Sequence, residues 1–426
     1  MKKLIYLFAV LFILASSCEK PVDRGDFGNP LIRFYGDAKD DIGYSIAETT
    51  GGYVICGKLT VIERGVNDAG STVIVGENPQ FGLIKTRRDG IQQWIYHAGG
   101  DGFDEGKKVI ALPDGSFICA GTATVTTGNT AHRDILVTKI SSTGQMIWEK
   151  YYGDELNETA EYFDQECYDL IRSYSGTGFL VVGSDNDDTR GNNPGNRNMY
   201  LLSINNDGEY IDSYSPGYDG DEYARSVSTT PSGNFIAVGT TDKSFTADTP
   251  GQDGMNIMTI VGSFTNLNQS DIKVYGGGDD EYVADVVESV AGNSIVGTRE
   301  LGLDSMEGLF VDLEVYGSIL PVSIEFSDFD LESNVMEILS IIRVPEGGYI
   351  AAGNTGGTEQ SGDMFFMFLD DLGNNVSSPE TFKTGGTGLQ SVNEAIIDSE
   401  GKVVAVGINS YENNSLITLI KFDPWE

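Results

Sequence analysis

A short segment that repeats seven times along the chain sets the tightest limit on its fold. Each copy has a turn, an apolar β-type stretch and a closing glycine, as in GGYVICG at 51–57, DGSFICAG at 114–121 and SGNFIAVG at 232–239. A period in the fifties with β-type segments predicts an all-β chain folded as a seven-bladed β-propeller, with one four-stranded antiparallel blade per unit. The closing glycines follow one another at intervals of 54 to 64 residues: Gly57, Gly121, Gly183, Gly239, Gly297, Gly353 and Gly407.

Four strands, named a to d from the centre outward, fit into each unit. In the second unit we expect them at 107–112, 116–121, 134–140 and 145–151. The seventh unit ends after strand c, at SLITLIKFDPWE, and so lacks strand d. RFYGD at 33–37 matches KYYGD at 150–154, which predicts that residues 31–35 supply the missing strand. The N-terminal strand would then complete the last blade and remove two open β-edges, which makes 31–426 a single domain.

The repeat resembles those of secreted bacterial propeller proteins of the delta-60 type, written Y-G-G…D-G-G-Y…G…D…K…G…W. The resemblance covers 31–423 and implies the fold rather than a function. The aspartate that opens strand c in this pattern is present at Asp134 and Asp363, and asparagine replaces it at Asn198 and Asn256. Eight-bladed quinone-binding propellers have a tryptophan in every blade. This chain has three tryptophans in all, which argues against such a cofactor.

The N-terminus has the pattern of a processing signal. Lys2 and Lys3 precede an apolar run at 4–15, which is too short to cross about 30 Å of hydrocarbon. The sequence ASSC at 15–18 resembles the lipobox of bacterial lipoproteins. That resemblance implies that the signal peptide 1–17 is removed and Cys18 is lipidated, with 18–30 as a flexible tether. The alternative is an ordinary secretory signal with a chance cysteine.

Composition bears on where the chain acts and on its partners. There are 64 Asp and Glu residues against 27 Lys and Arg, a formal charge of −37, which excludes nucleic acid and anionic membrane surfaces as partners. The signal and the acidic, Gly/Asn/Tyr-rich body resemble outer-membrane lipoproteins of Bacteroidota-type bacteria. We therefore expect a monomer in the cell envelope, held to the outer membrane only by lipid, with a glycan, peptide or protein as its partner.

Strand polarity sorts the connections between strands onto two faces. Neighbouring strands in a blade are antiparallel, so the d–a and b–c connections leave from one face. The d–a connections are rich in Gly and acid, and the long insertions are b–c loops at 58–80, 122–133, 184–197, 240–254, 298–306 and 354–362. We call this side the loop face, and we expect the binding site there because loops on a rigid scaffold carry function.

Acidic residues recur at equivalent places in the d–a connections. They are Asp41, Asp104, Glu222 and Glu281. One interpretation is a carboxylate-lined funnel for a cation, a basic group or sugar hydroxyls. The other is that the carboxylates bind backbone N–H groups and lock each blade crossover, which recurrence in several blades favours.

Other candidate sites are weaker. Asp185 and Asp187 are further candidates for the binding face. Together with Asp188 they offer oxygen ligands for calcium, but Arg190 stands where a calcium loop needs glycine. The acids at 328–332 are expected to form a solvated loop. The chain has only two histidines and no pair of cysteines at the spacing of zinc ligands, which argues against a zinc site. We expect no metal or other cofactor, with calcium at 185–188 as the exception to test.

The remaining cysteines are Cys56, Cys119 and Cys167, an odd number. Relative to the closing glycines, Cys56 and Cys119 fall on opposite faces of their sheets, which argues against a disulfide between them. All three are expected to be buried and free.

Two function classes fit these features. The first is a lipid-anchored binding or scaffold protein that uses the loop face. The second is a hydrolase or lyase acting on polysaccharide, with paired carboxylates in the central funnel. No nucleophile, phosphate-loop or dinucleotide motif occurs in a strand-to-helix context. The sequence also indicates no residue with a perturbed environment, so we favour the binding protein over the enzyme. A structural subunit of an envelope complex is a third alternative.

Overall fold

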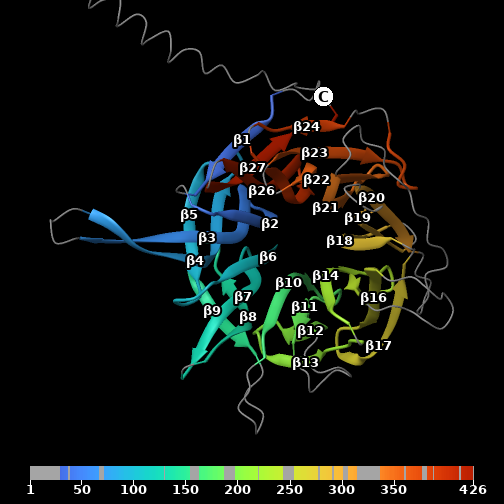
Figure 1. Cartoon of the computed structure of the whole chain (residues 1–426), viewed down its shortest axis with the longest axis horizontal. Coiled ribbons are helices and arrows are strands. Elements are labelled where there is room, and N and C mark those ends of the chain that lie inside the picture. Colours follow the sequence, from blue (N-terminus) through green and yellow to red (C-terminus); the bar gives the residue numbers. More distant parts are fainter. Residues whose placement is uncertain are drawn as a thin grey trace, which may run out of the picture.

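The chain forms a ring of seven antiparallel sheets around a central axis (Figure 1). This computed structural model describes residues 29–36, 39–66, 72–128, 130–153, 163–186, 197–218, 220–242, 254–276, 279–289, 292–300, 306–313, 336–358, 361–376, 381–386, 388–411 and 414–425. Six of the sheets have four described strands and one has three. In this part of the chain no helix is long and apolar enough to cross a membrane. The predicted all-β seven-bladed propeller is confirmed.

The strands follow one another along the chain, from the inside of each blade to the outside. Blades 1 and 2 contain β2 (Ile42–Thr49), β3 (Gly52–Val66), β4 (Thr72–Arg87), β5 (Gln92–Ala98), β6 (Glu105–Ala111), β7 (Phe117–Thr127), β8 (Thr130–Ile140) and β9 (Met146–Tyr152). Blades 3 and 4 contain β10 (Gln165–Arg172), β11 (Gly178–Asp185), β12 (Asn198–Asn205), β13 (Tyr210–Tyr214), β14 (Glu222–Thr229), β15 (Phe235–Thr241), β16 (Asn256–Ser263) and β17 (Asn266–Tyr275). Blades 5 and 6 contain β18 (Asp280–Glu288), β19 (Asn293–Glu300), β20 (Met306–Leu313), β21 (Met336–Arg343), β22 (Tyr349–Thr358), β23 (Ser361–Leu369) and β24 (Phe382–Thr384). Blade 7 contains β25 (Gln390–Ile397), β26 (Val403–Tyr411), β27 (Asn414–Phe422) and the N-terminal β1 (Leu31–Tyr35).

The two ends of the chain close the ring as predicted. β1 pairs antiparallel with β27 along its whole length, from Leu31 opposite Lys421 to Tyr35 opposite Ile417. The Tyr35 hydroxyl also donates a 2.7 Å hydrogen bond to the Gly90 carbonyl in blade 1. This hydrogen bond links blade 7 to blade 1. β1 therefore both completes blade 7, by pairing with β27, and contacts the blade that follows it in the ring.

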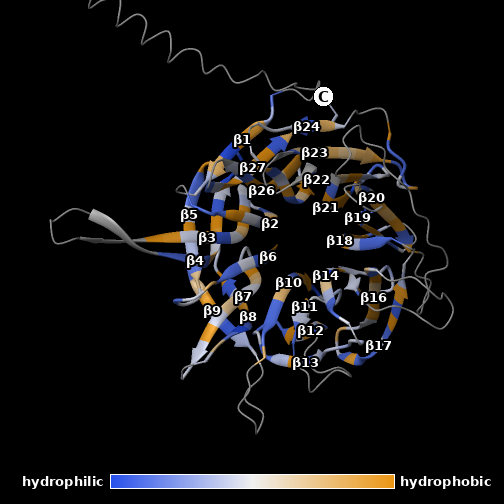
Figure 2. Ribbon diagram, viewed as in Figure 1, coloured by the Kyte–Doolittle hydropathy of each residue, from blue (hydrophilic) through white to orange (hydrophobic). Residues whose placement is uncertain are grey.

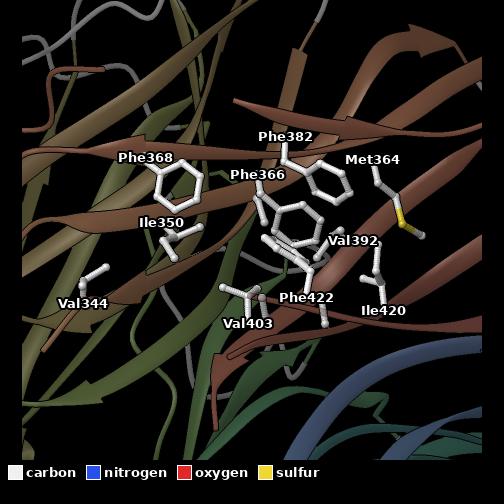
Figure 3. Packing of buried hydrophobic residues seen from close by; sticks show 13 residues of the cluster. Val344, Ile350, Met364, Phe366, Phe368, Phe382, Val392, Val403, Ile420 and Phe422 are labelled. Atoms are coloured by element: carbon white, nitrogen blue, oxygen red, sulfur yellow. The ribbon is translucent and has the colours of Figure 1, made fainter. Parts of the chain in front are cut away.

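The core lies between the blades, where apolar side chains of adjacent sheets meet. Apolar colouring runs along strands such as β23 in Figure 2. Between blades 6 and 7, Phe366, Phe382 and Phe422 pack together, with ring centroids of Phe422 4.9 Å and 4.7 Å from the other two (Figure 3). Each blade therefore buries both faces, and its inner strands are nearly continuous runs of buried residues.

Three of the predicted b–c loops are strand extensions rather than loops. In the first blade β3 pairs with β4 as far as Val66 opposite Thr72, and the hairpin projects beyond the ring in Figure 1. The insertions at 122–133 and 354–362 likewise continue the pairing of their strands, to Thr127 opposite Thr130 and to Thr358 opposite Ser361. Runs rich in threonine and valine, such as TATVTT, favour extended backbone, which accounts for the difference.

Two positions of the repeat pattern, the aspartate that opens strand c and the glycine after strand d, contact each other in the structure. A Cβ added to Gly153, at the end of strand d, would lie 2.1 Å from Oδ1 of Asp134, which opens strand c. The same contact joins Gly385 to Asp363 at 1.8 Å. The aspartate of strand c and the glycine after strand d therefore occur together because one packs directly on the other.

Candidate functional site: the central cavity of the loop face

A β-bulge interrupts the innermost strand of every blade at the same place. In blade 2, Gly106 pairs with Gly121 and Lys108 with Ala120, so Lys107 is an extra residue without a partner. Corresponding shifts occur in the other six sheets. A bulge turns its extra side chain away from the regular alternation of the strand.

The closing glycines make these bulges fit. A Cβ at each of them would lie between 1.7 Å (Gly183) and 2.1 Å (Gly121) from a carbonyl oxygen of strand a. Any residue other than glycine has a Cβ, which would clash with this carbonyl oxygen unless the strand moved. The strongest repeat signal in the sequence is thus a structural requirement of the seven bulges.

The seven extra side chains meet in one cavity of about 650 Å³ on the axis of the ring. Thr240, Thr298 and Met306, which flank b–c connections, also line it, so the cavity opens on the loop face. The extra residues, in order from blade 1 to blade 7, are Tyr44, Lys107, Tyr168, Arg225, Ala284, Leu339 and Asn393. We call them the bulge ring.

Blade 1 contributes the aromatic ring of Tyr44 to the cavity, and blade 2 contributes Lys107, whose charge is paired with Glu105. The Lys107 ammonium lies 3.8 Å from the centroid of the Tyr44 ring and 2.9 Å from Oε1 of Glu105. Burial, and then the nearby Glu105, raise the pKa of the Tyr44 hydroxyl well above its usual value. Tyr44 is therefore a neutral phenol at physiological pH, held flat against a cation.

Blades 3 and 4 contribute a second such arrangement. The guanidinium carbon of Arg225 lies 4.8 Å from the Tyr168 ring centroid and 5.5 Å from that of Tyr223. The Tyr168 hydroxyl donates a 2.8 Å hydrogen bond to Glu166, and burial, followed by the charge of Glu166, raises the pKa of Tyr168 to about 12. The aromatic rings thus orient the guanidinium toward the cavity.

Blades 5 and 6 contribute acids and smaller side chains. Glu300, Glu337 and Tyr282 line this part of the cavity beside Ala284 and Leu339 of the bulge ring. The Asn354 amide donates a 2.9 Å hydrogen bond to Glu337, which fixes one carboxylate oxygen. The cavity therefore combines aromatic, cationic and anionic groups in separate sectors.

One residue further along each inner strand lies a second ring of polar side chains, which we call the inner ring. Its members are Ser45, Lys108, Asp169, Ser226, Asp285, Ser340 and Glu394. Six of them accept a hydrogen bond from a backbone N–H of the next blade: Val109 to Ser45, Val227 to Asp169, Val286 to Ser226, Ile341 to Asp285, Ala395 to Ser340 and Ile46 to Glu394. The inner ring links all but one of the blade junctions in this way.

The remaining junction lies between blades 2 and 3. The inner-ring residue there is Lys108, whose ammonium cannot accept a hydrogen bond, so it links the blades by ion pairs instead. Its ammonium lies 3.2 Å from Asp169 Oδ1 and 2.5 Å from Glu394 Oε1. Burial lowers the Lys108 pKa, but Asp169, Glu394 and Asp285 outweigh it and hold the pKa well above its usual value. Burial also raises the pKa of Asp285 to about 6, against the attraction of Lys108. For Asp285, burial thus outweighs the attraction of Lys108, so this carboxyl titrates near pH 6.

The recurring d–a acids lie away from the cavity. Asp41, Asp104, Glu222 and Glu281 are all buried. Asp41 accepts a hydrogen bond from the Thr60 N–H at 2.7 Å, and Asp104 accepts one from the Gly100 N–H and another from the Thr124 N–H, both at 2.7 Å.

The two glutamates make comparable local contacts. Glu222 accepts bonds from the Tyr218 N–H and the Thr241 hydroxyl, and burial raises its pKa to about 7. Glu281 lies 3.8 Å from Arg299 Nε. These are the contacts of the turn-locking interpretation, and other residues line the funnel.

The calcium candidates are only partly within the described residues. Asp185 is buried at the end of β11, where it accepts a 2.8 Å hydrogen bond from the Ser215 hydroxyl. Asp187, Asp188 and the acids at 328–332 lie outside the described residues, as does Cys18. Across the described ranges, no group of three His, Cys, Asp or Glu side chains could hold a metal ion.

The three described cysteines are buried and free. The geometric reason that we gave for Cys56 and Cys119 was wrong. They do face opposite sides of their sheets, but those sides belong to neighbouring blades and face each other. Both side chains therefore lie in the same core cluster between blades 1 and 2.

The candidate cavity opens on the face that the sequence analysis expected, but residues that the sequence analysis did not single out line it. The bulge ring lies 13 to 15 residues before each closing glycine. At these seven equivalent positions the residues differ in charge, size and polarity, whereas the closing residue is always glycine. The sequence signal that could have indicated these residues is that a position equivalent in all seven repeats carries different side chains.

Comparisons with known proteins identify no family for the chain. No protein-family model matches the chain, and no curated protein matches it in sequence. Among solved structures it is similar to the Cps50 (Swd1) β-propeller domain of Myceliophteria thermophila, with a TM-score of 0.47 and 10% identity over 85% of this chain and 98% of that one. It is also similar to the periplasmic gluconolactonase PpgL of Pseudomonas aeruginosa, with a TM-score of 0.43 and 11% identity over 82% and 84%. A protein of unknown function from Bacteroides caccae has a TM-score of 0.41 and 12% identity over 77% and 94%.

Proposed function

We propose that this protein is a lipid-anchored binding protein of the bacterial cell envelope, which takes a small polar ligand, such as part of a glycan or peptide, into the central cavity. The single observation that carries the proposal is the bulge ring. Seven structurally equivalent positions converge on one cavity and carry two tyrosines, two cations, one amide and two apolar side chains. The closing glycines show that a fixed structural contact keeps a position alike in all seven blades, and no such contact makes the bulge ring uniform.

The physical form of the cavity supports ligand binding. Its volume of about 650 Å³ is in the range that holds small organic ligands. The tyrosines supply flat apolar surface with a polar edge, and Arg225, Glu300 and Asn393 supply donors and acceptors. The inner ring holds the floor of the cavity rigid by linking the blades, which reduces the ordering cost of binding.

The proposed location follows from the N-terminal sequence. The apolar run at 4–15 and Cys18 support export, lipidation and attachment to the outer membrane. A direct test is to label cells with a radioactive fatty acid and to compare the protein with its Cys18→Ala variant. The variant should lose the label and leave the membrane fraction. Label on the variant would refute the anchor.

A binding screen tests the cavity. Mono- and oligosaccharides and short peptides are titrated calorimetrically into the full-length protein in detergent. The Ala284→Trp variant, which fills the cavity from blade 5, should abolish every binding event. The Ser232→Trp variant carries the same added bulk on an exposed turn of the opposite face and should bind normally. Binding that survives in Ala284→Trp would refute the cavity as the site.

The polysaccharide hydrolase or lyase remains the second candidate, because Glu300 and Glu337 both line the cavity. A pair of carboxylates on opposite sides of a glycosidic bond is the usual machinery of such enzymes. The same oligosaccharides are incubated with the protein and analysed for cleavage. Products that disappear in both Glu300→Gln and Glu337→Gln would establish the enzyme in place of the binding protein.

A further inference from the structure

We propose that the ligand carries a carboxylate and that Arg225 binds it; this inference rests on the proposed function of the cavity. Arg225 is the extra residue of the blade 4 bulge, and its side chain is exposed within the cavity lining. Among the described residues, no carboxylate lies within ion-pair distance of it. A guanidinium placed this way offers a planar pair of donors that matches a carboxylate.

The neighbouring acid on blade 3 is already occupied. Glu166 receives a hydrogen bond from the Tyr168 hydroxyl at 2.8 Å, an ion pair from Arg197 at 3.3 Å and another from Arg133. Two arginines and a hydroxyl thus compensate the charge of Glu166, which weakens its attraction for Arg225. The arrangement therefore keeps the guanidinium available in a strongly acidic protein.

The second cation of the bulge ring provides an internal comparison. Lys107 is mostly buried and pairs with Glu105 at 2.9 Å, so its charge is compensated before any ligand arrives. Arg225 instead lies over the rings of Tyr168 and Tyr223. Stacking on aromatic faces holds the guanidinium in one plane without neutralising it.

The acidic sector of the cavity defines the rest of the ligand. Glu300 and Glu337 accept hydrogen bonds, so they favour the hydroxyl or ammonium groups of a ligand whose carboxylate lies at Arg225. Two small-molecule classes have this chemistry: uronic acid sugars and amino acids or short peptides. The overall charge of −37 disfavours a long anionic polymer, because only its bound unit would reach the cation.

The test uses matched ligand pairs that differ only in the carboxylate. Glucuronate and galacturonate, with their disaccharides, are compared with glucose, galactose and the neutral disaccharides. Amino acids and dipeptides are compared with their C-terminal amides. Each is titrated into the full-length protein, into Arg225→Gln and into Arg33→Gln, which removes the same charge from the exposed outer strand β1. The unfolding midpoint of each variant confirms that it is folded.

We expect at least one acid to bind tenfold or more tightly than its neutral counterpart. Arg225→Gln should remove that preference, and Arg33→Gln should keep it. Neutral and acidic members that bind equally, with Ala284→Trp still blocking both, would overturn the role of Arg225 and leave the binding cavity intact. An acid preference that persists in Ala284→Trp, or no binding by any pair, would overturn both proposals.

Discussion

Removal of the Lys108 ammonium should destabilise the ring at neutral pH and much less in acid. Lys108 lies 3.2 Å from Asp169, and at an effective dielectric constant of about 20 two unit charges at this separation attract by about 5 kcal/mol. Desolvation offsets much of this attraction. Loss of one partner of a buried pair costs about 3–5 kcal/mol, and the 25% exposure of the Lys108 side chain places the expected loss near the lower limit, about 3 kcal/mol.

The pH dependence gives this prediction its sharpest form. In Lys108→Met the carboxylates of Asp169, Asp285 and Glu394 repel one another without compensation. The pKa of Asp285, already raised to about 6, should rise further, because a like charge disfavours ionisation. The free-energy difference between wild type and variant should therefore shrink as the pH falls from 8 to 5.

Urea unfolding followed by tryptophan fluorescence at pH 5, 6, 7 and 8 measures this difference. Lys85→Met is the control, since Lys85 is buried but bonds to Thr86 and Gln93 rather than to acids, and burial lowers its pKa. Its substitution should cost little at any of these pH values. A Lys108→Met variant within 0.5 kcal/mol of wild type at pH 8, or one that loses more stability in acid, would refute the proposed charge balance.

Three further predictions concern the same framework. Asp285→Asn should stabilise the protein at pH 7.5: because the pKa of Asp285 is about 6 in the fold and about 3.9 when unfolded, its contribution is complete below pH 4 and lost as the pH rises through 6, by at most about 3 kcal/mol. Urea titrations at pH 4 and 7.5 test this, and an unchanged pH slope would count against it. Gly121→Ala should cost about 1–3 kcal/mol or more, because its Cβ would lie 2.1 Å from the Glu105 carbonyl oxygen, whereas Gly386→Ala, with nothing within 4 Å, should change stability by less than 0.5 kcal/mol; equal losses at both glycines would contradict the bulge account. Tyr35→Phe should cost about 1 kcal/mol by removing the buried bond to Gly90, and a variant as stable as wild type would show that this bond adds nothing to closure.

The fold was largely predictable because the repeat reports backbone geometry. The closing glycines and the turns recur wherever the chain must approach itself closely, and RFYGD at 33–37 marks the strand that completes blade 7. The extended hairpins were missed because the insertions were assigned by length, and runs such as TATVTT continue a strand as readily as they form a loop.

For the candidate site, the sequence predicted the face on which the cavity opens but not the residues that line it. The acids at Asp41, Asp104, Glu222 and Glu281 drew attention because they recur, but recurrence is the property of a structural contact. The residues of the bulge ring were missed because of the bulge itself. A bulge shifts the alternation by one residue, so a regular strand pattern assigns their side chains to the wrong face.

A crystal structure of the protein with the tightest ligand from the screen tests the central claim most directly. The account predicts density in the axial cavity of the loop face, in contact with Tyr168 and Arg225. Ligand bound instead at the d–a acids, or on the outer wall of the blades with the cavity empty, would contradict it.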